Sequence, residues 1–226
     1  PGNGIVVRRS SKYVRFFLAH KTRQKGSTHP QLKIAMRHAL IERLSGMHEV
    51  LDCYGGMGIM YDACYRPYDG TVMELDPLRI ESLARARPTW RVFEGDSPRM
   101  LAAGVIRGRC ISLIDCDSYG SPWPALEGFF TGHDLFPFCL AIAMTCGDIQ
   151  KIDLTGGWDI KGWQPYVQRY GNKLKPIFLA VCQERLANLV TSRGYRIAWW
   201  HGAYGHRRHA AYCAAVLHLT PEIVAP

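Results

Sequence analysis

Acidic residues follow short apolar runs at four places in the first half of the chain. Asp52 precedes a turn with three glycines at positions 55–58, and Glu74 and Asp96 follow two later runs. The fourth place, residues 115–122, combines two acids with a tyrosine and a Gly-Ser-Pro turn. Carboxylates accept hydrogen bonds from hydroxyl and amino groups, so these residues could bind a ribose, an adenine and a reacting amine.

The elements that must position these residues alternate along the chain. Apolar periodicity predicts helices over 30–44, 59–65, 78–86, 98–103, 122–130 and 176–192, and strands over 49–53, 71–75, 90–94, 110–116 and 138–145. A loop is expected over 146–163, and a β-hairpin over 195–201 and 209–219. Alternating strands and helices predict an α/β fold, with a mostly parallel sheet covered on both faces and an antiparallel last strand.

The turn after Asp52 is the first candidate ligand site. Open α/β sheets bind ligands at the carboxyl ends of their strands, and glycine lets the backbone approach a ligand closely. We therefore assign a cofactor site to Asp52, Tyr54, Gly55, Gly56 and Gly58. Taken alone, this pattern allows any nucleotide cofactor, or a tight turn with no ligand.

Two later strand ends extend this site. Glu74 with Leu75 follows the turn by about 20 residues, a spacing suited to ribose hydroxyls, while Asp76 before Pro77 is expected to cap a helix. Asp96 with Ser97 is placed to meet an adenine amino group, although either residue could instead cap the next helix.

The segment 115–122 predicts the chemistry. The lone pair of an exocyclic base amine is delocalised into the ring, and a carboxylate that accepts its hydrogen bonds draws the lone pair toward a methyl donor. Positioning is the main catalytic contribution in such a transfer. We assign the catalytic segment to Asp117, Ser118, Tyr119 and Pro122, with Tyr119 stacking on the base, and we add Asp115 to the cofactor site.

The four motifs in this order resemble class I methyltransferases that use S-adenosylmethionine (SAM). The segment 115–122 is similar to the Asp-x-Asp-Pro-Phe-Gly-Ser-Pro segment of the tRNA guanine-N2 (position 26) dimethyltransferase family, with Ser118 in place of that proline. The resemblance covers roughly residues 48–145 and implies a Rossmann-like seven-stranded sheet, SAM as the cofactor and a role in tRNA processing. It puts Asp117 on the catalytic Asp, Tyr119 on the stacking aromatic, and three acids on cofactor-binding positions, namely Asp52, Glu74 and Asp96.

Basic residues gather at the start of the chain. The net charge is +9, and no Asp or Glu occurs before Glu42. Nine basic residues precede that point, which leaves 19 basic and 19 acidic residues after it. Such a segment suits a polyanion, RNA more than DNA here, although it could also be a solvated arm. We expect a basic arm over 1–28 and one domain over 29–226, with phosphates bound by Arg8, Arg9, Lys12, Arg15, Lys21, Arg23, Lys25, Arg207 and Arg208.

Several classes of protein are not favoured. None of the eight cysteines forms a Cys-x-x-Cys pair, so neither zinc nor a disulfide framework is expected. No apolar run is long enough for a membrane span, and a cytoplasmic location is expected. Trp199 and Trp200 should face opposite sides of a strand, while Trp158 and Trp163 could either reach a substrate or pack within their loop.

Three alternatives remain open to the interpretation as a base N-methyltransferase. The substrate could be a small molecule or a protein. The chain could bind SAM and nucleic acid without turnover. A nicotinamide-dependent dehydrogenase would also use the glycine turn and Glu74, but it gives no reason for the segment 115–122.

Overall fold

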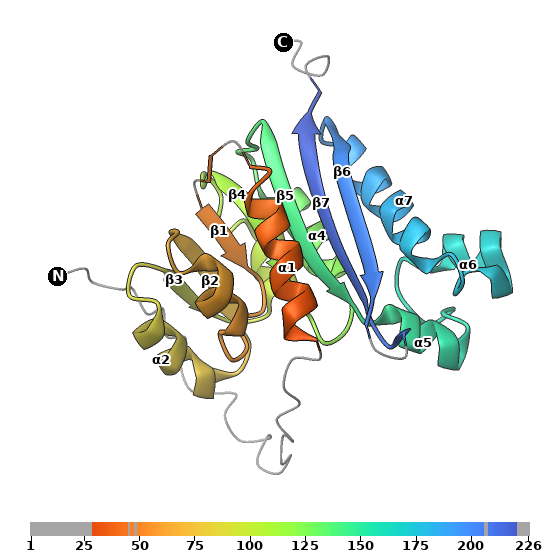
Figure 1. Ribbon diagram of the computed structural model, residues 1–226, viewed down its shortest axis with the longest axis horizontal. Helices are drawn as coiled ribbons and strands as arrows, with labels where there is room; N and C mark the ends of the chain where they lie inside the picture. The colour runs from red at the N-terminus through yellow and green to blue at the C-terminus, as the bar shows by residue number, and fades with distance from the viewer. Residues whose placement is uncertain (1–28, 45, 48, 206–207, 221–226) are drawn as a thin grey trace.

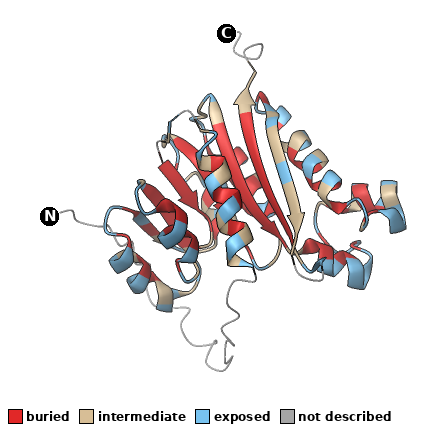
Figure 2. Ribbon diagram, viewed as in Figure 1, coloured by how far each residue is buried: buried red, intermediate tan, exposed pale blue. Residues whose placement is uncertain are grey.

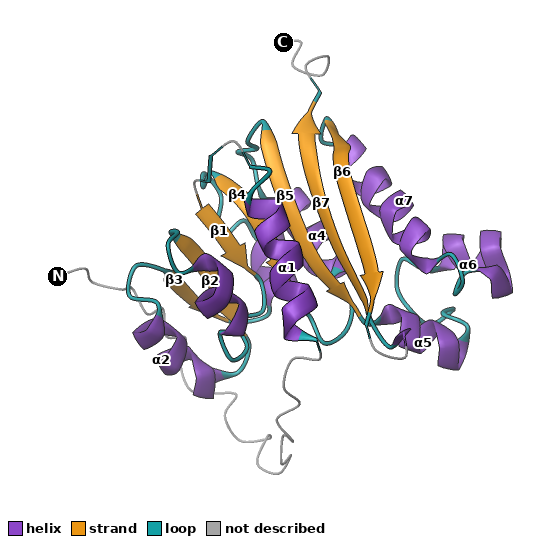
Figure 3. Cartoon of the chain, in the orientation of Figure 1, coloured by secondary structure: helices purple, strands orange, loops and turns teal. Residues whose placement is uncertain are grey.

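A seven-stranded sheet forms the centre of the computed structural model, which describes residues 29–44, 46–47, 49–205 and 208–220 (Figures 1 and 3). The strand order is β3-β2-β1-β4-β5-β7-β6. The strands are β1 (Glu49–Asp52), β2 (Gly70–Glu74), β3 (Arg91–Glu94), β4 (Ile111–Cys116), β5 (Cys139–Cys146), β6 (Tyr195–Tyr204) and β7 (Ala211–Leu219). Each predicted strand is present, with ends that differ by a few residues.

The direction of the strands confirms the predicted fold class. Strands β1 to β5 pair in parallel, whereas β7 lies antiparallel between β5 and β6. The last strand of the chain is therefore the antiparallel one. The hairpin inserts β7 into the sheet and leaves β6 at its edge.

Helices connect the strands and cover both faces of the sheet. They are α1 (Pro30–Ile41), η1 (Tyr61–Tyr65, a π-helix), α2 (Pro77–Ala86), α3 (Ser97–Ala102), α4 (Trp123–Gly132), α5 (Asp148–Thr155), α6 (Gln164–Tyr170), η2 (Gly171–Lys173, a 3₁₀-helix) and α7 (Phe178–Thr191). Asp76 caps α2 as predicted, because its side chain accepts a hydrogen bond from the Leu78 N–H group.

The predicted loop over 146–163 is partly wrong, because α5 forms within it. Gly147 and Gly156 flank this helix, and its eight residues are too few for a clear periodic signal. Ile149 and Ile152 nevertheless lie three residues apart, and both are buried against the sheet. The sequence did not predict this helix because it is short, is flanked by glycines and has only two buried apolar residues.

Two apolar clusters separate the layers. One lies under α1, η1 and α2, and the other lies under α3, α4 and α7. Figure 2 shows buried central strands between helices whose outer surfaces are exposed, whereas β6 at the edge is only partly buried. Trp199 packs against the first cluster and Trp200 against the second, which confirms that they face opposite sides.

The register of the sheet brings the predicted acids together. Asp52 of β1 lies beside Asp115 of β4. Successive strand residues face opposite sides, so Asp117 lies on the same side as Asp115. That side is the one covered by α1, which packs against β5 and β7 (Figure 1).

No helix among the described residues is long and apolar enough to cross a membrane. Within the same residues, no group of His, Cys, Asp or Glu side chains is arranged to bind a metal ion.

Candidate functional site

A cavity of about 820 Å³ lies at the carboxyl edge of the sheet, between the glycine turn and the end of β4. Its size is within the range of cofactor pockets. Nine of the predicted site residues line it: Asp52, Tyr54, Gly55, Gly56, Gly58, Glu74, Asp117, Ser118 and Tyr119. The structure therefore brings most of the predicted cofactor and catalytic residues to one cavity.

The glycines of the turn are required for different reasons. A Cβ on Gly55 would lie 2.6 Å from a Val72 methyl carbon and 2.9 Å from one of Leu83, so packing excludes a side chain there. Gly56 and Gly58 have φ angles of +51° and +79°, a region that side chains rarely adopt. Beyond its chain neighbours, a Cβ on Gly56 would meet only the Tyr54 carbonyl oxygen within 4 Å, at 3.6 Å, so the backbone of the turn is open toward the cavity.

Glu74 faces this turn from the end of β2. One carboxylate oxygen accepts the Gly56 N–H group at 2.7 Å, and the other accepts the Asp76 N–H group at 2.9 Å. A carboxylate oxygen accepts more than one hydrogen bond, so both retain capacity for a ligand. Arg79 lies 3.9 Å from the same carboxylate and also lines the cavity.

Asp52 forms a buried ion pair with Arg87, which follows the end of α2. The Arg87 Nη1 atom is 2.9 Å from Asp52 Oδ2, and the Tyr54 N–H group donates to Oδ1. Burial raises the pKa of Asp52 to about 6, although Arg87 acts in the opposite direction. The Arg87 guanidinium is enclosed by the rings of Tyr61 and Trp90, at 4.6 and 5.1 Å from their centroids.

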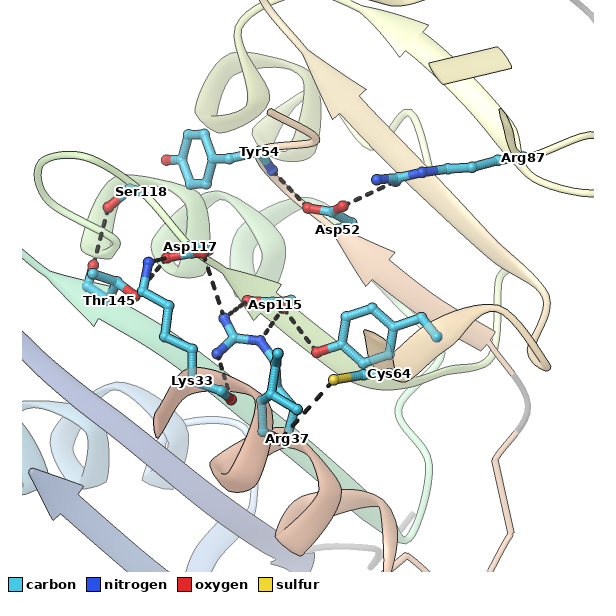
Figure 4. Close-up of polar contacts among 12 residues, drawn as sticks. Lys33, Arg37, Asp52, Tyr54, Cys64, Arg87, Asp115, Asp117, Ser118 and Thr145 are labelled. Atoms are coloured by element: carbon cyan, nitrogen blue, oxygen red, sulfur yellow. Dashed lines mark hydrogen bonds and ion pairs between the residues drawn. The ribbon is translucent and has the colours of Figure 1, made fainter. Parts of the chain in front are cut away.

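Asp117, the predicted catalytic residue, is held by three side chains (Figure 4). Its Oδ1 atom accepts hydrogen bonds from Lys33 Nζ at 2.5 Å and Thr145 Oγ1 at 2.6 Å, and its Oδ2 atom lies 4.0 Å from Arg37 Nη2. Burial alone would raise the pKa of Asp117, but Arg37, Lys33 and the hydrogen bonds bring that pKa below its usual value. Asp117 is therefore an ionised hydrogen-bond acceptor.

Asp115 is not part of the cavity, which corrects its predicted place in the cofactor site. It is buried under α1, where two Arg37 nitrogens, Nε and Nη2, donate to its two oxygens at 2.6 Å. The Tyr65 hydroxyl donates a further hydrogen bond at 2.8 Å. These three donors occupy the carboxylate, so Asp115 anchors α1 to β4.

The spacing of charges on α1 matches that on β4. Lys33 and Arg37 lie four residues apart on one face of the helix, a rise of about 6 Å. Asp115 and Asp117 lie two residues apart on one face of the strand, a distance of about 6.7 Å. Because α1 runs antiparallel to β4, Lys33 meets Asp117 and Arg37 meets Asp115.

The sequence interpretation missed these two cations, since it counted Lys33 and Arg37 only within the basic N-terminal excess. Both are buried and paired with acids, so they are not part of an exposed basic surface. Two spacings could have identified these cations: four residues between the cations on a helix and two residues between the acids on a strand cover similar distances. Arg87 and Thr145 were also missed, and no sequence pattern marks either residue.

Four other predicted residues do not line the cavity. Ser97 is buried and donates its hydroxyl to the Cys53 carbonyl, which corrects its predicted place at the cofactor. Pro122 directly precedes α4 and does not line the cavity either. Leu75 is exposed, and Asp96 precedes α3 without a side-chain cap and lies 3.4 Å from Arg99. Contacts of Leu75 and Asp96 with a cofactor remain predictions.

The loop after β4 lines the cavity beside Asp117. Tyr119 lines the cavity and is 79% exposed. The Ser118 hydroxyl donates to the Thr145 carbonyl, and the Ser121 hydroxyl donates to the buried Asp148. The Gly147 N–H group donates to the Gly120 carbonyl at 2.8 Å. These bonds fix the loop against the end of β5 and leave Tyr119 projecting.

Residues near the tip of the hairpin differ in whether they line the cavity. His209 and Ala210, next to the hairpin tip, line the cavity, while Arg208 is exposed and lies against the Tyr204 ring.

Trp163 is buried and stacks on Phe178 at 4.9 Å, so its role is packing. Trp158 is 59% exposed and does not line the cavity. The other predicted phosphate-binding residues lie outside the described residues: Arg8, Arg9, Lys12, Arg15, Lys21, Arg23, Lys25 and Arg207.

No protein-family model matches the sequence, and no curated protein matches it. Solved structures do match. A candidate hemolysin from Streptococcus thermophilus has a TM-score of 0.55 at 11% identity, with 88% of this chain and 70% of that chain covered. TYW2 from M. jannaschii, solved in complex with AdoMet, has a TM-score of 0.51 at 12% identity, with 87% and 79% covered. A SAM-dependent methyltransferase from Leishmania major has a TM-score of 0.51 at 13% identity, with 83% and 72% covered.

The described chain therefore has the Rossmann-like fold of SAM-dependent methyltransferases, with seven strands and one of them antiparallel. Identities this low show the fold and not the reaction.

Proposed function

We propose that this protein is a SAM-dependent N-methyltransferase that acts on an exocyclic amine of a nucleic-acid base, in RNA rather than DNA. The carrying observation is the position of Asp117. This ionised acceptor lines the same cavity as the glycine turn and Glu74. One cavity thus combines groups suited to a nucleoside cofactor with a carboxylate suited to an amine.

The residues at the cofactor side fit SAM. The open backbone at Gly56 allows a ligand to approach closely. Glu74 accepts hydrogen bonds of the kind that ribose hydroxyls donate, and Asp52 would lie near the methionine end. When bound, SAM supplies an electrophilic methyl group, which the amine takes with its lone pair while the carbon–sulfur electrons stay on sulfur.

The residues at the substrate side orient the amine. No described residue donates a hydrogen bond to Asp117 Oδ2, because Lys33 and Thr145 both bond to Oδ1. Oδ2 can therefore accept an amine hydrogen and then take the proton that the amine loses as the nitrogen–carbon bond forms. Tyr119 offers an exposed ring on which a base can stack. A base within a duplex would have to be flipped out to reach this cavity.

Two features support a nucleic-acid substrate. The segment 115–122 resembles that of the tRNA guanine-N2 dimethyltransferases, which favours RNA. Seven basic residues also precede residue 29 with no acidic residue among them, and the chain continues from there into α1, whose Lys33 lines the cavity. Because this segment is covalently continuous with α1, a polyanion bound by it would be kept at a high effective concentration near the reactive centre.

The experiment is incubation of the full chain with methyl-labelled SAM and, separately, total RNA, DNA and a protein and metabolite extract. We expect label in RNA nucleosides after digestion, and SAM binding by calorimetry without any polymer. A matched full-length variant with the seven basic residues changed to Gln should bind SAM normally but lose transfer to RNA, with a weaker salt dependence. Label only in metabolites or protein, or SAM binding without any transfer, would contradict the proposal.

A further inference from the structure

A lysine beside Asp117 brings a hydrogen-bond donor to the cavity. Lys33 comes from the first turn of α1 and lines the cavity with Asp117. Its side chain is 7% exposed, so its ammonium is held in a defined position. Figure 4 shows Lys33 reaching from α1 to the end of β4, where Asp117 and Thr145 meet it.

Lys33 has more donors than partners. A lysine ammonium has three N–H groups, and the hydrogen bond that Lys33 Nζ makes within the described residues goes to Asp117 Oδ1. The face of the Tyr212 ring lies 5.4 Å from the nitrogen and provides a cation–π contact instead of an acceptor. A buried donor without an acceptor is costly, so an acceptor supplied by a ligand would complete the site.

The Asp117 carboxylate has an oxygen, Oδ2, that accepts no hydrogen bond from the described residues. Thr145 and Lys33 occupy Asp117 Oδ1, whereas the nearest cation to Oδ2 is Arg37 at 4.0 Å, beyond hydrogen-bonding distance. Arg37 is itself committed to Asp115 through two hydrogen bonds. The substrate side thus presents one acceptor, Oδ2, next to one donor, the Lys33 ammonium.

Base edges differ in whether they match this pair. Adenine and cytosine each have an exocyclic amine next to an unprotonated ring nitrogen on the base-pairing edge, so a donor stands beside an acceptor. Guanine has an amine next to a ring N–H group on that edge, so two donors stand together. Enzymes that flip a base recognise it by hydrogen bonds to this edge, and a lysine facing a ring N–H group would leave two donors opposed.

We propose that Lys33 determines base specificity, by donating a hydrogen bond to the ring nitrogen beside the target amine while Asp117 accepts from the amine. The substrate class is then an amidine-type edge, adenine or cytosine, rather than guanine. This inference rests on the proposed methyltransferase function and adds the identity of the base edge to it. Lys33 would contact the substrate directly, and its cation would also compensate the charge of Asp117.

The experiment combines product identification with a double-mutant cycle in the full chain. Nucleosides from labelled RNA and DNA are first separated by mass spectrometry, and we expect methyl groups on adenine N6 or cytosine N4. Short oligonucleotides are then made with 1-deazaadenine or 3-deazacytosine, which replaces the ring nitrogen by C–H. Wild type should lose about 10- to 100-fold in kcat/KM on the deaza substrate, as expected for one hydrogen bond to a charged donor.

The variant Lys33→Met separates a contact from a structural role. Its kcat/KM should fall by a similar factor on the normal base, with little further loss on the deaza base, because the two changes remove the same hydrogen bond. Arg79→Met is the matched control, since it removes a cavity-lining cation on the cofactor side. It should leave the ratio between normal and deaza substrates as in wild type.

The outcomes separate this inference from the proposed function. Methylation confined to guanine N2 would overturn the inference and leave the methyltransferase proposal intact. The inference would also fail if the deaza substrate lowered kcat/KM of Lys33→Met by the same factor as that of wild type, because Lys33 would then only position Asp117. Absence of transfer to any nucleic-acid base, with SAM bound, would overturn the proposed function and the inference with it.

Discussion

Each side of the cavity has an acid paired with a basic side chain, but the pKa values of the two acids shift in opposite directions. On the side proposed for the cofactor, Asp52 pairs with Arg87 from the end of α2, and on the side proposed for the substrate, Asp117 pairs with Lys33 from the start of α1. Asp52 has one cation and one backbone donor, and burial prevails, so its pKa rises to about 6. Asp117 has two cations and a hydroxyl donor, and its pKa falls.

The two acids differ in their charged neighbours as well as in burial: Asp115 acts with burial to raise the pKa of Asp52 against Arg87, whereas Arg37 and Lys33 lower that of Asp117. Both acids lie on the same face of one sheet, in a cavity that both line. Asp52 gains or loses its proton near pH 6, whereas Asp117 remains ionised throughout the physiological range. The substrate side has a fixed acceptor, and it owes this to α1, a helix more than 70 residues away in sequence.

The largest expected effect comes from releasing α1 from the substrate side. Arg37→Met would leave Asp115 buried with only the Tyr65 hydroxyl as a side-chain donor. Breaking a buried ion pair on one side costs about 3–5 kcal/mol, and the free energy of unfolding in urea should fall by that amount. Arg85→Ala, which breaks the exposed pair with Glu81, is the control and should change little.

Removing both partners tests the same point if the single variant fails to fold. Arg37→Met combined with Asp115→Asn should recover much of the lost stability, since no uncompensated charge remains. A single variant as stable as Arg85→Ala would show that the contact between α1 and β4 does not depend on this ion pair.

The second effect is a pH dependence on the cofactor side. Burial raises the pKa of Asp52 from 3.8 to about 6, so between these pH values the folded protein keeps a proton that the unfolded chain has lost. The free energy of unfolding due to Asp52 therefore falls as the pH rises from about 4 to about 6, by about 3 kcal/mol. Urea unfolding of wild type and Asp52→Asn should give a difference that declines over this window and is constant above it.

The substrate side gives the opposite sign and serves as the control. Because the pKa of Asp117 is lowered, its stabilising contribution is present above its usual pKa and is lost as the pH falls through the acid range below it. The difference between wild type and Asp117→Asn should thus stay constant from about pH 5 to 7. Parallel curves for the two variants would refute the contrast between the two sides.

The third effect is on turnover. Asp117→Asn keeps the shape of the side chain but replaces one carboxylate oxygen by a donor, which misplaces the amine. We expect kcat to fall about 100-fold, with the affinity for SAM measured by calorimetry unchanged. Asp134→Asn, a surface carboxylate paired with Arg107, should keep wild-type kcat. A kcat that is unchanged in Asp117→Asn would exclude Asp117 as the acceptor.

Local patterns were sufficient to predict the sheet and the glycine turn, because strands, turns and caps are set by neighbouring residues. Asp76 and Pro77 predict the start of α2 in this way, and the structure confirms it. The environment of Asp117 could not be read locally, since Lys33 and Thr145 reach it from 84 and 28 residues away. Ser97 was misassigned for a related reason, because its partner, the Cys53 carbonyl, belongs to another strand end.

The smallest expected effect is on the binding of the base itself, measured as KM for the nucleic acid. Tyr119 is 79% exposed, and its proposed role is to stack on the base. Tyr119→Ala should raise KM for the nucleic acid about tenfold, in line with one base–aromatic stack, and Tyr119→Phe should restore it. Trp158→Ala is the matched control, because that exposed ring does not line the cavity. If Trp158→Ala raised KM as much as Tyr119→Ala, the base would extend beyond the cavity toward α5, and the stacking role of Tyr119 would have to be shared.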